Sequence, residues 1–287
     1  MRKFQIVTDS SCDLPQYKVD ELGLKVAQLD VLVEGRPTKE DCDVDPKEFY
    51  KGLREGLMAS TSAANIDKFT KIFEEIANEG NDVLYIGFSS GLSATYQAST
   101  IAASDVMAAH PECKIVTVDS LCASLGQGLL VYHAAALARK GKSIDEVAKF
   151  VEDNRLNLCH WFTVDDLHFL KRGGRISAAT AVVGSMLSIK PILHVDDEGH
   201  LVNVGKTRGR RKSIEEMFHM MEETAIKPAD QVIYISHGDC LEDAEYLASL
   251  IRDKWGNKEI LINFVGPVIG AHSGPGTLAL FFLGKKR

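Results

Sequence analysis

The amino-acid sequence predicts an α/β protein of two domains, an N-terminal parallel sheet with helices on both faces and a C-terminal mixed α/β domain. Short apolar runs alternate with amphipathic helices through roughly the first 150 residues, and this order is typical of a parallel sheet. The apolar runs are continuous rather than alternating, as expected for strands that are buried on both faces. After about residue 160 the helices become fewer and the linking segments are rich in glycine and charge, which favours a mixed sheet. We therefore divide the chain into residues 1–160 and 161–287.

The predicted strands of the first domain end in small polar residues. They are residues 4–8, followed by Asp9-Ser10-Ser11, residues 83–88, followed by Ser89-Ser90-Gly91, and residues 114–118, followed by Asp119-Ser120. Ligands of such sheets bind at the carboxyl ends of the strands. These polar ends therefore indicate where a binding site is expected.

The helices between the strands have recognisable starts. Asp45-Pro46-Lys47-Glu48 is typical of a capping box with proline at the first helical position. Ser143 with Glu146 and Ser213 with Glu216 predict two further helix starts of this kind. An amphipathic helix is predicted by one apolar stripe at helical spacing, formed by Ile66, Phe69, Ile72, Phe73 and Ile76.

The second half of the chain contains five further runs that are typical of strands. They are residues 159–164, 192–195, 201–204, 232–235 and 260–264. The run at 232–235 leads into Ser236-His237-Gly238, so the polar strand end recurs here. These runs predict the mixed sheet of the C-terminal domain.

The composition of the 287 residues is that of a globular protein, with 45% hydrophobic and 25% charged residues. No apolar stretch approaches the roughly 20 residues of a membrane span, and Asp9 follows the start too closely for a signal peptide. The six cysteines are scattered without a C-x-x-C pair or the histidine spacing of a zinc site. We expect a cytoplasmic protein with reduced thiols and without a metal site.

The charge is unevenly distributed along the chain. A net charge of −7 argues against nucleic-acid binding, which requires a basic surface. Between Asp166 and Lys212, however, nine Lys and Arg residues face four acids, a net charge of +5. Such a basic cluster can attract an acidic protein partner or an anionic membrane surface, and the plain alternative is a solvated charged face. The candidates for partner docking are Arg172, Arg175, Arg208 and Arg211.

Two segments resemble nucleotide-binding motifs, a P-loop and a dinucleotide-binding fingerprint, but do not match them. Gly199 to Thr207 has five residues between its glycines where a P-loop needs four. Gly126-Gln127-Gly128 is followed by Val131 where a dinucleotide fingerprint requires glycine or alanine. Neither segment predicts a nucleotide site.

A third motif, Gly87-Phe88-Ser89-Ser90-Gly91, matches the G-x-S-x-G nucleophile elbow between a predicted strand and a predicted helix. Ser89 with Asp119 and either His237 or His272 would give the alternative function, a serine hydrolase that acts on an acyl ester. The simpler interpretation is a strand end of small residues whose backbone N–H groups face a ligand.

Hydroxyl side chains gather where two helices are expected to begin. Residues 60–65 read Ser-Thr-Ser-Ala-Ala-Asn, and residues 89–95 contain four hydroxyls. A helix start presents unpaired N–H groups, so added hydroxyls make a neutral cradle for an anion, although helix capping alone explains one hydroxyl per helix. His272 lies between glycine-rich turns beside Ser273, which favours a ligand-binding role for its ring.

Taken together in this order, the motifs make the chain resemble the DegV family of bacterial fatty-acid-binding proteins over its whole length. The resemblance is carried by Thr8-Asp9-Ser10, Thr61-Ser62, Ser89-Ser90-Gly91-Leu92-Ser93, Asp119-Ser120, Gly126-Gln127-Gly128, Gly173-Gly174-Arg175-Ile176, Ile189-Lys190-Pro191, Lys206-Thr207-Arg208-Gly209 and Gly266 to Thr277. The chain departs from the usual family pattern at Ala63-Ala64-Asn65, at Ala94 and at Ser273.

The resemblance implies a protein that holds one long-chain fatty acid between two α/β domains. The family's carboxylate-binding threonine, serine and histidine correspond to Thr61, Ser93 and His272, and we assign Ser62 to the same site. It further implies that the carboxylate is presented to a separate fatty acid kinase, which makes an acyl phosphate for phospholipid synthesis. The chain itself would then be no enzyme and would need no cofactor.

The physical chemistry of a fatty acid sets the requirements for such a site. Each methylene gains ~0.8 kcal/mol on leaving water, so about fourteen of them require an enclosed apolar tunnel. Hydroxyls, helix N–H groups and the His272 ring could bind the carboxylate, so we expect no direct Arg or Lys contact. The predicted tunnel walls are Ile86, Phe88, Leu92, Phe162, Leu187, Ile189, Ile192 and Phe264.

Overall fold

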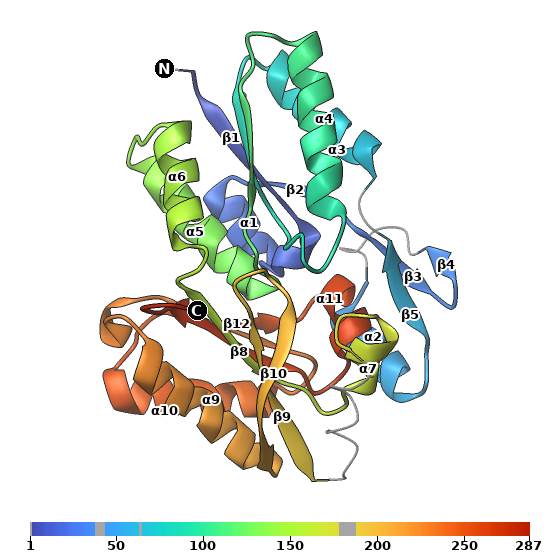
Figure 1. Ribbon diagram of the computed structural model, residues 1–287, viewed down its shortest axis with the longest axis vertical. Coiled ribbons are helices and arrows are strands. Elements are labelled where there is room, and N and C mark those ends of the chain that lie inside the picture. The colour runs from blue at the N-terminus through green and yellow to red at the C-terminus, as the bar shows by residue number, and fades with distance from the viewer. Residues whose placement is uncertain (1, 38–43, 63–64, 178–187) are drawn as a thin grey trace.

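The computed structural model describes residues 2–37, 44–62, 65–177 and 188–287. Two large sheets form its framework, and helices cover the faces of both (Figure 1). The predicted α/β class, with an N-terminal parallel sheet and a C-terminal mixed sheet, is confirmed.

The N-terminal sheet is entirely parallel and has the strand order β2-β1-β6-β7. Its strands are β1 (Phe4–Asp9), β2 (Lys25–Ala27), β6 (Asp82–Gly87) and β7 (Ile115–Asp119). All six residues of β6 are buried, as expected for a strand that is covered on both faces. The three predicted strands of this domain are therefore present.

Helices cover both faces of this sheet, as Figure 1 shows for α3 and α4 on one side and α5 and α6 on the other. The first group packs in one apolar cluster and comprises α2 (Pro46–Arg54), α3 (Ile66–Asn78) and α4 (Thr95–Ala109). The second group packs in another cluster and comprises α1 (Gln16–Leu22), α5 (Leu125–Arg139) and α6 (Ile144–Asn154). This second cluster also includes Leu158, Phe162 and Phe281 of the C-terminal sheet, so the two sheets share a core.

The C-terminal sheet is mixed and has the strand order β10-β9-β8-β13-β11-β12. Its strands are β8 (Leu158–Thr163), β9 (Ile189–Val195), β10 (Leu201–Arg208), β11 (Ile233–His237), β12 (Ile260–Phe264) and β13 (Leu278–Leu283). Helices α9 (Arg210–Thr224) and α10 (Leu241–Trp255) cover its outer face. The five predicted strands are present, and β13 is an additional one. Because β8 begins at Leu158, this sheet starts before residue 161, and the division at residue 160 stays a prediction.

A third, small sheet was not predicted. It is antiparallel, has the order β4-β3-β5, and consists of β3 (Asp30–Val33), β4 (Arg36–Pro37) and β5 (Ala59–Ser62). The hydroxyl-rich segment before α3 is therefore a strand rather than a helix start. Asn65 caps α3 instead, with its side chain accepting a hydrogen bond from the Lys68 N–H at 2.9 Å.

The predicted helix starts are confirmed in two of three cases. Asp45 accepts a hydrogen bond from the Glu48 N–H, and Ser143 forms a complete capping box with Glu146. The start at Ser213 is wrong, because α9 begins at Arg210 and the Ser213 hydroxyl donates to the Arg210 carbonyl from within the helix.

Two short helices, α7 (His168–Arg172) and α11 (Pro267–Ser273), complete the part of the chain that bears the site. Within the described residues, no helix is long and apolar enough to cross a membrane.

Candidate ligand-binding site

A cavity lies where the three sheets and α11 meet. Its walls are predominantly apolar and come from the loop after β6, from strands β8, β9, β10 and β13, and from α11. The apolar lining residues are Leu29, Phe88, Leu92, Ala123, Phe162, Leu170, Val195, Leu201, Val265, Val268, Ile269, Ala279 and Phe281. This lining suits an apolar ligand.

The four predicted ligand-binding residues, Thr61, Ser62, Ser93 and His272, all line this one cavity. Thr61 comes from β5, Ser93 from the loop before α4, and His272 from α11. The structure thus brings together residues that are up to 211 positions apart in sequence. Their role in binding a carboxylate stays a prediction.

Thr61 and His272 form a direct pair, in which the Thr61 Oγ1 lies 2.7 Å from the His272 Nε2. If Nε2 carries the ring proton, it donates to Thr61, and the Thr61 hydroxyl hydrogen is free for a ligand. The ring fits because residue 173 is glycine: a Cβ there would lie 2.3 Å from the His272 Nδ1.

The His272 ring is neutral at physiological pH. Burial, and to a smaller extent the positive charges of Arg175 and Arg172, lower its pKa to about 4. The ring is therefore a neutral hydrogen-bonding group and contributes no charge of its own to the site.

Ser93 and Ser62 differ in how their hydroxyls are engaged. The Ser93 Oγ accepts from the Thr95 N–H at 3.2 Å and lies 2.9 Å from the Thr95 Oγ1. If the Thr95 hydroxyl is the donor in this second contact, the Ser93 hydrogen can turn toward a ligand. The Ser62 hydroxyl donates to the Asp30 carboxylate at 3.4 Å and is exposed. Ser93 is thus better placed than Ser62 to bind an anion.

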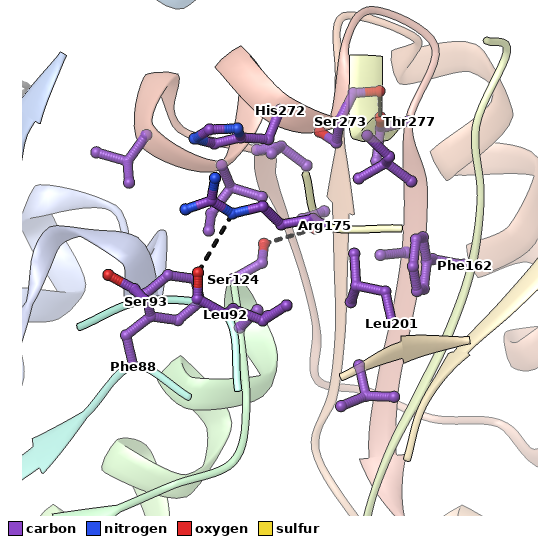
Figure 2. Close-up of a pocket in the computed structure, with 18 of the residues that line it drawn as sticks. Phe88, Leu92, Ser93, Ser124, Phe162, Arg175, Leu201, His272, Ser273 and Thr277 are labelled. Atoms are coloured by element: carbon purple, nitrogen blue, oxygen red, sulfur yellow. Dashed lines mark hydrogen bonds between the residues drawn. The ribbon is translucent and has the colours of Figure 1, made fainter. Parts of the chain in front are cut away.

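Arg175, one of the predicted docking residues, also lines the cavity, and the expected absence of a direct Arg or Lys contact with the carboxylate stays a prediction. Its Nε donates to the Leu92 carbonyl at 3.2 Å, and its Nη1 donates to the Gly173 carbonyl. Figure 2 shows the Arg175 side chain reaching between His272 and Leu92. The half-buried guanidinium therefore places a positive charge beside the predicted carboxylate site, so Arg175 does not belong only to an outer docking face.

The other three arginines of the predicted docking surface are exposed. Arg172 stacks over the Phe169 ring at 4.8 Å, and Arg211 lies over the Tyr246 ring at 3.5 Å. Arg208 ends β10. Part of the basic segment is neutralised, because Lys190 pairs with Asp165 at 2.6 Å and Arg210 with Asp243 at 2.8 Å.

The predicted tunnel walls are only partly those observed. Phe88, Leu92 and Phe162 line the cavity, and Leu187 lies outside the described residues. Ile86, Ile189, Ile192 and Phe264 do not line it. Ile192 faces the outer cluster with α9 and α10, and Phe264 stacks on Tyr50 with a centroid distance of 6.5 Å. Ala63 and Ala64 also lie outside the described residues.

The hydrolase alternative is not supported by the geometry around Ser89. Its buried hydroxyl donates to the Gly199 carbonyl at 2.9 Å and accepts from the Gly91 N–H at 3.2 Å. Neither His237 nor His272 contacts it in the described part of the chain: His237 accepts from the Cys240 N–H, and His272 pairs with Thr61. The Ser89 hydroxyl therefore stabilises the turn at Gly199 through a hydrogen bond. It is not in contact with either histidine of the proposed triad, the general base that a serine nucleophile requires.

The rejected nucleotide motifs have structural roles. Gly126 opens α5 against His160, where a Cβ would lie 2.3 Å from the His160 Nε2, and Gly205 to Thr207 belong to β10. Ser124 and His160 are polar cavity residues that the sequence did not indicate, whereas Ser236 and Thr277 belong to segments noted in the sequence.

Comparisons with known proteins agree with this architecture. Residues 3–285 match the family model described as "Uncharacterised protein, DegV family". A DegV domain-containing protein of Clostridium perfringens is 49% identical over 286 residues, which cover 99% of this chain and 98% of that protein.

Solved structures give the same result. A structure described as fatty acid binding of a DegV family protein from Thermus thermophilus has a TM-score of 0.86 and 31% identity, and the match covers 99% of this chain and 100% of that one. DegV from Bacillus subtilis, described as a fatty acid binding protein, has a TM-score of 0.86 and 28% identity, with the same coverage. The resemblance inferred from the motifs is thus confirmed, and the chain belongs to the DegV family.

Proposed function

We propose that this protein binds a long-chain fatty acid in the cavity and presents its carboxylate to a partner fatty acid kinase, which forms an acyl phosphate. The observation that carries this proposal is the convergence of Thr61, Ser93 and His272 on one apolar cavity, with the charge of Arg175 beside them. The fatty acid binding described for the relatives from Thermus thermophilus and Bacillus subtilis supports it. In this proposal the chain is a cytoplasmic carrier without a cofactor and itself catalyses no reaction.

The cavity provides what each end of a fatty acid requires. The apolar walls remove the alkyl chain from water, which contributes ~0.8 kcal/mol per methylene. The hydroxyls of Thr61 and Ser93 can donate to the carboxylate, and the nearby guanidinium of Arg175 reduces the cost of burying its negative charge. We assign the carboxylate to the Thr61, Ser93 and His272 end of the cavity.

Native mass spectrometry of the freshly purified protein tests the binding function. A fatty acid that is enclosed in such a cavity dissociates slowly, so we expect the protein to carry an additional mass of about one long-chain fatty acid. Extraction with organic solvent should release the acid and identify it. A protein that carries no lipid, and that takes up no added oleic or stearic acid, would contradict the proposal.

The exposed arginines supply the proposed docking surface for the kinase, or for transient contact with an anionic membrane. We expect the double substitution of Arg208→Glu and Arg211→Glu to reduce kinase-dependent phosphorylation of the bound acid at least about tenfold, because charge reversal at a rim slows association. Fatty acid affinity should stay the same, since neither residue lines the cavity.

The matched control is Lys254→Glu on α10, an exposed cation that pairs with Glu222 and lies outside the basic segment. Equal losses in the control and the double variant would show a general charge effect, and a loss of fatty acid binding would show that the arginines act on the cavity.

A further inference from the structure

Two serine hydroxyls in the apolar wall of the cavity have hydrogen-bonding capacity that the protein does not use. Ser236 lies on β11 and is fully buried. Within the described residues, its hydroxyl has one partner, the Ser124 hydroxyl at 3.0 Å, which Figure 2 draws as a dashed line from Ser124. The second hydroxyl is that of Ser273, which is buried and has no hydrogen-bond partner among the described residues. Both serines line the cavity.

The direction of the hydrogen bonds at Ser236 follows from its neighbours. Ser124 donates its single hydroxyl hydrogen to the Asp13 carboxylate. In the contact between the two serines, Ser236 must therefore be the donor. This leaves the Ser236 oxygen with acceptor capacity only, and it borders the cavity.

Ser236 belongs to the wall that faces the alkyl chain rather than to the carboxylate end. It pairs across the sheet with Ala279, which in turn pairs with Phe162, so the three side chains share one face of the sheet. Ala279 and Phe162 are apolar lining residues. The carboxylate residues Thr61 and His272 come instead from β5 and α11.

We infer that the cavity contains a subsite at Ser236 for a hydroxyl group on the fatty acid chain, and that its preferred ligand class includes hydroxylated long-chain fatty acids. The inference rests on the proposed function and adds the substrate class to it. An unsubstituted chain leaves the Ser236 acceptor without a partner in an apolar surrounding, which is unfavourable. A hydroxyl on the chain carbon that lies beside Ser236 can donate to the Ser236 oxygen. It then extends the chain of hydrogen bonds that runs from Ser236 through Ser124 to Asp13.

The subsite is selective in two respects. A hydroxyl at any other carbon meets an apolar wall and loses its hydrogen bonds to water, so binding should depend on position. A keto group at the matching carbon can only accept, and Ser236 could donate to it only by giving up its bond to Ser124. The hydroxy acid should therefore bind more tightly than the corresponding oxo acid.

The test measures the affinity of the delipidated protein for stearic acid and for a set of hydroxystearic acids that differ in hydroxyl position, by displacement of a fluorescent fatty acid. We expect one position, or two adjacent ones, to bind about tenfold more tightly than the other hydroxy isomers, as one buried hydrogen bond would give. The oxo acid of that position should lose this advantage. In Ser236→Ala the hydroxy isomers should bind with similar affinities, while stearic acid binds at least as tightly as before.

The outcomes separate the subsite from the carrier function. If stearic acid binds but the hydroxy isomers show no preferred position, the subsite is refuted and the carrier function stands. If neither stearic acid nor any isomer binds, the carrier function fails, and the subsite fails with it. A preference that survives in Ser236→Ala but is lost in Ser273→Ala would overturn the assignment to Ser236. The affinities of the unaltered protein for the different hydroxystearic acids show whether the subsite exists, whether or not the variants fold.

Discussion

Replacing His272 with leucine should weaken the binding of stearic acid by about 10- to 100-fold. His272 lies 2.7 Å from Thr61 and orients its hydroxyl, and hydrogen bonds to a charged group contribute about 1.5–3 kcal/mol. Leucine removes this partner, so the Thr61 hydroxyl is no longer directed at the carboxylate. Isothermal titration calorimetry with the delipidated protein measures the effect, and circular dichroism checks the fold.

A double-mutant cycle shows whether the two residues act as a unit. We expect Thr61→Val alone to cause a loss of similar size, and Thr61→Val with His272→Leu to lose little more than either single variant. His272→Gln is the matched control, because its amide N–H can still donate to Thr61 and should restore part of the affinity. If the two substitutions lower the affinity for stearic acid additively, His272 does not act by orienting Thr61. If neither substitution changes this affinity, the carboxylate binds elsewhere.

Filling the cavity at Ala279 should prevent long fatty acids from binding. Ala279 lines the cavity from β13, a strand at the centre of the C-terminal sheet, and its side chain is small. If the ring of Ala279→Trp displaces about four methylenes, at ~0.8 kcal/mol each, the affinity for stearic acid falls by about 200-fold. Competition against a fluorescent fatty acid measures this loss.

A graded substitution serves as the control for this prediction. Ala279→Val adds much less volume and should weaken the longest acids while shorter ones bind as before. Thermal unfolding of both variants checks that the added side chain occupies the cavity without disrupting the sheet. Normal binding of stearic acid to Ala279→Trp would show that the alkyl chain does not pass this strand.

The sequence predicted those strands that contain a continuous apolar run. The run at residues 83–88, for example, corresponds to the fully buried β6. It did not predict β5, since Ser60-Thr61-Ser62 carries hydroxyls typical of a helix start, and only pairing with β3 makes it a strand. Local preference was overridden here by a tertiary contact.

That Thr61, Ser93 and His272 line one cavity was predictable because they belong to a recognisable set of motifs, whereas most of the cavity walls were not predictable. Ile192 and Leu193 are adjacent and equally apolar, yet Ile192 packs on the outer helices and Leu193 in the core between the sheets. Which side of a strand faces a cavity depends on packing that is not local. That Arg175 also lines the cavity was not predictable for a similar reason, because its charge in a basic segment does not show that its guanidinium turns inward.

The position of β13 has a consequence for how the chain folds. This strand is the last of the C-terminal sheet in sequence, yet it lies between β8 and β11 and pairs with both. During synthesis, β8 and β11 can be joined in one sheet only after residues 278–283 have been made. The hydrogen bond between Thr61 and His272 likewise forms only after His272 has been made. Such long-range pairing slows folding and leaves the unpaired edges of β8 and β11 open to aggregation until β13 is inserted between them.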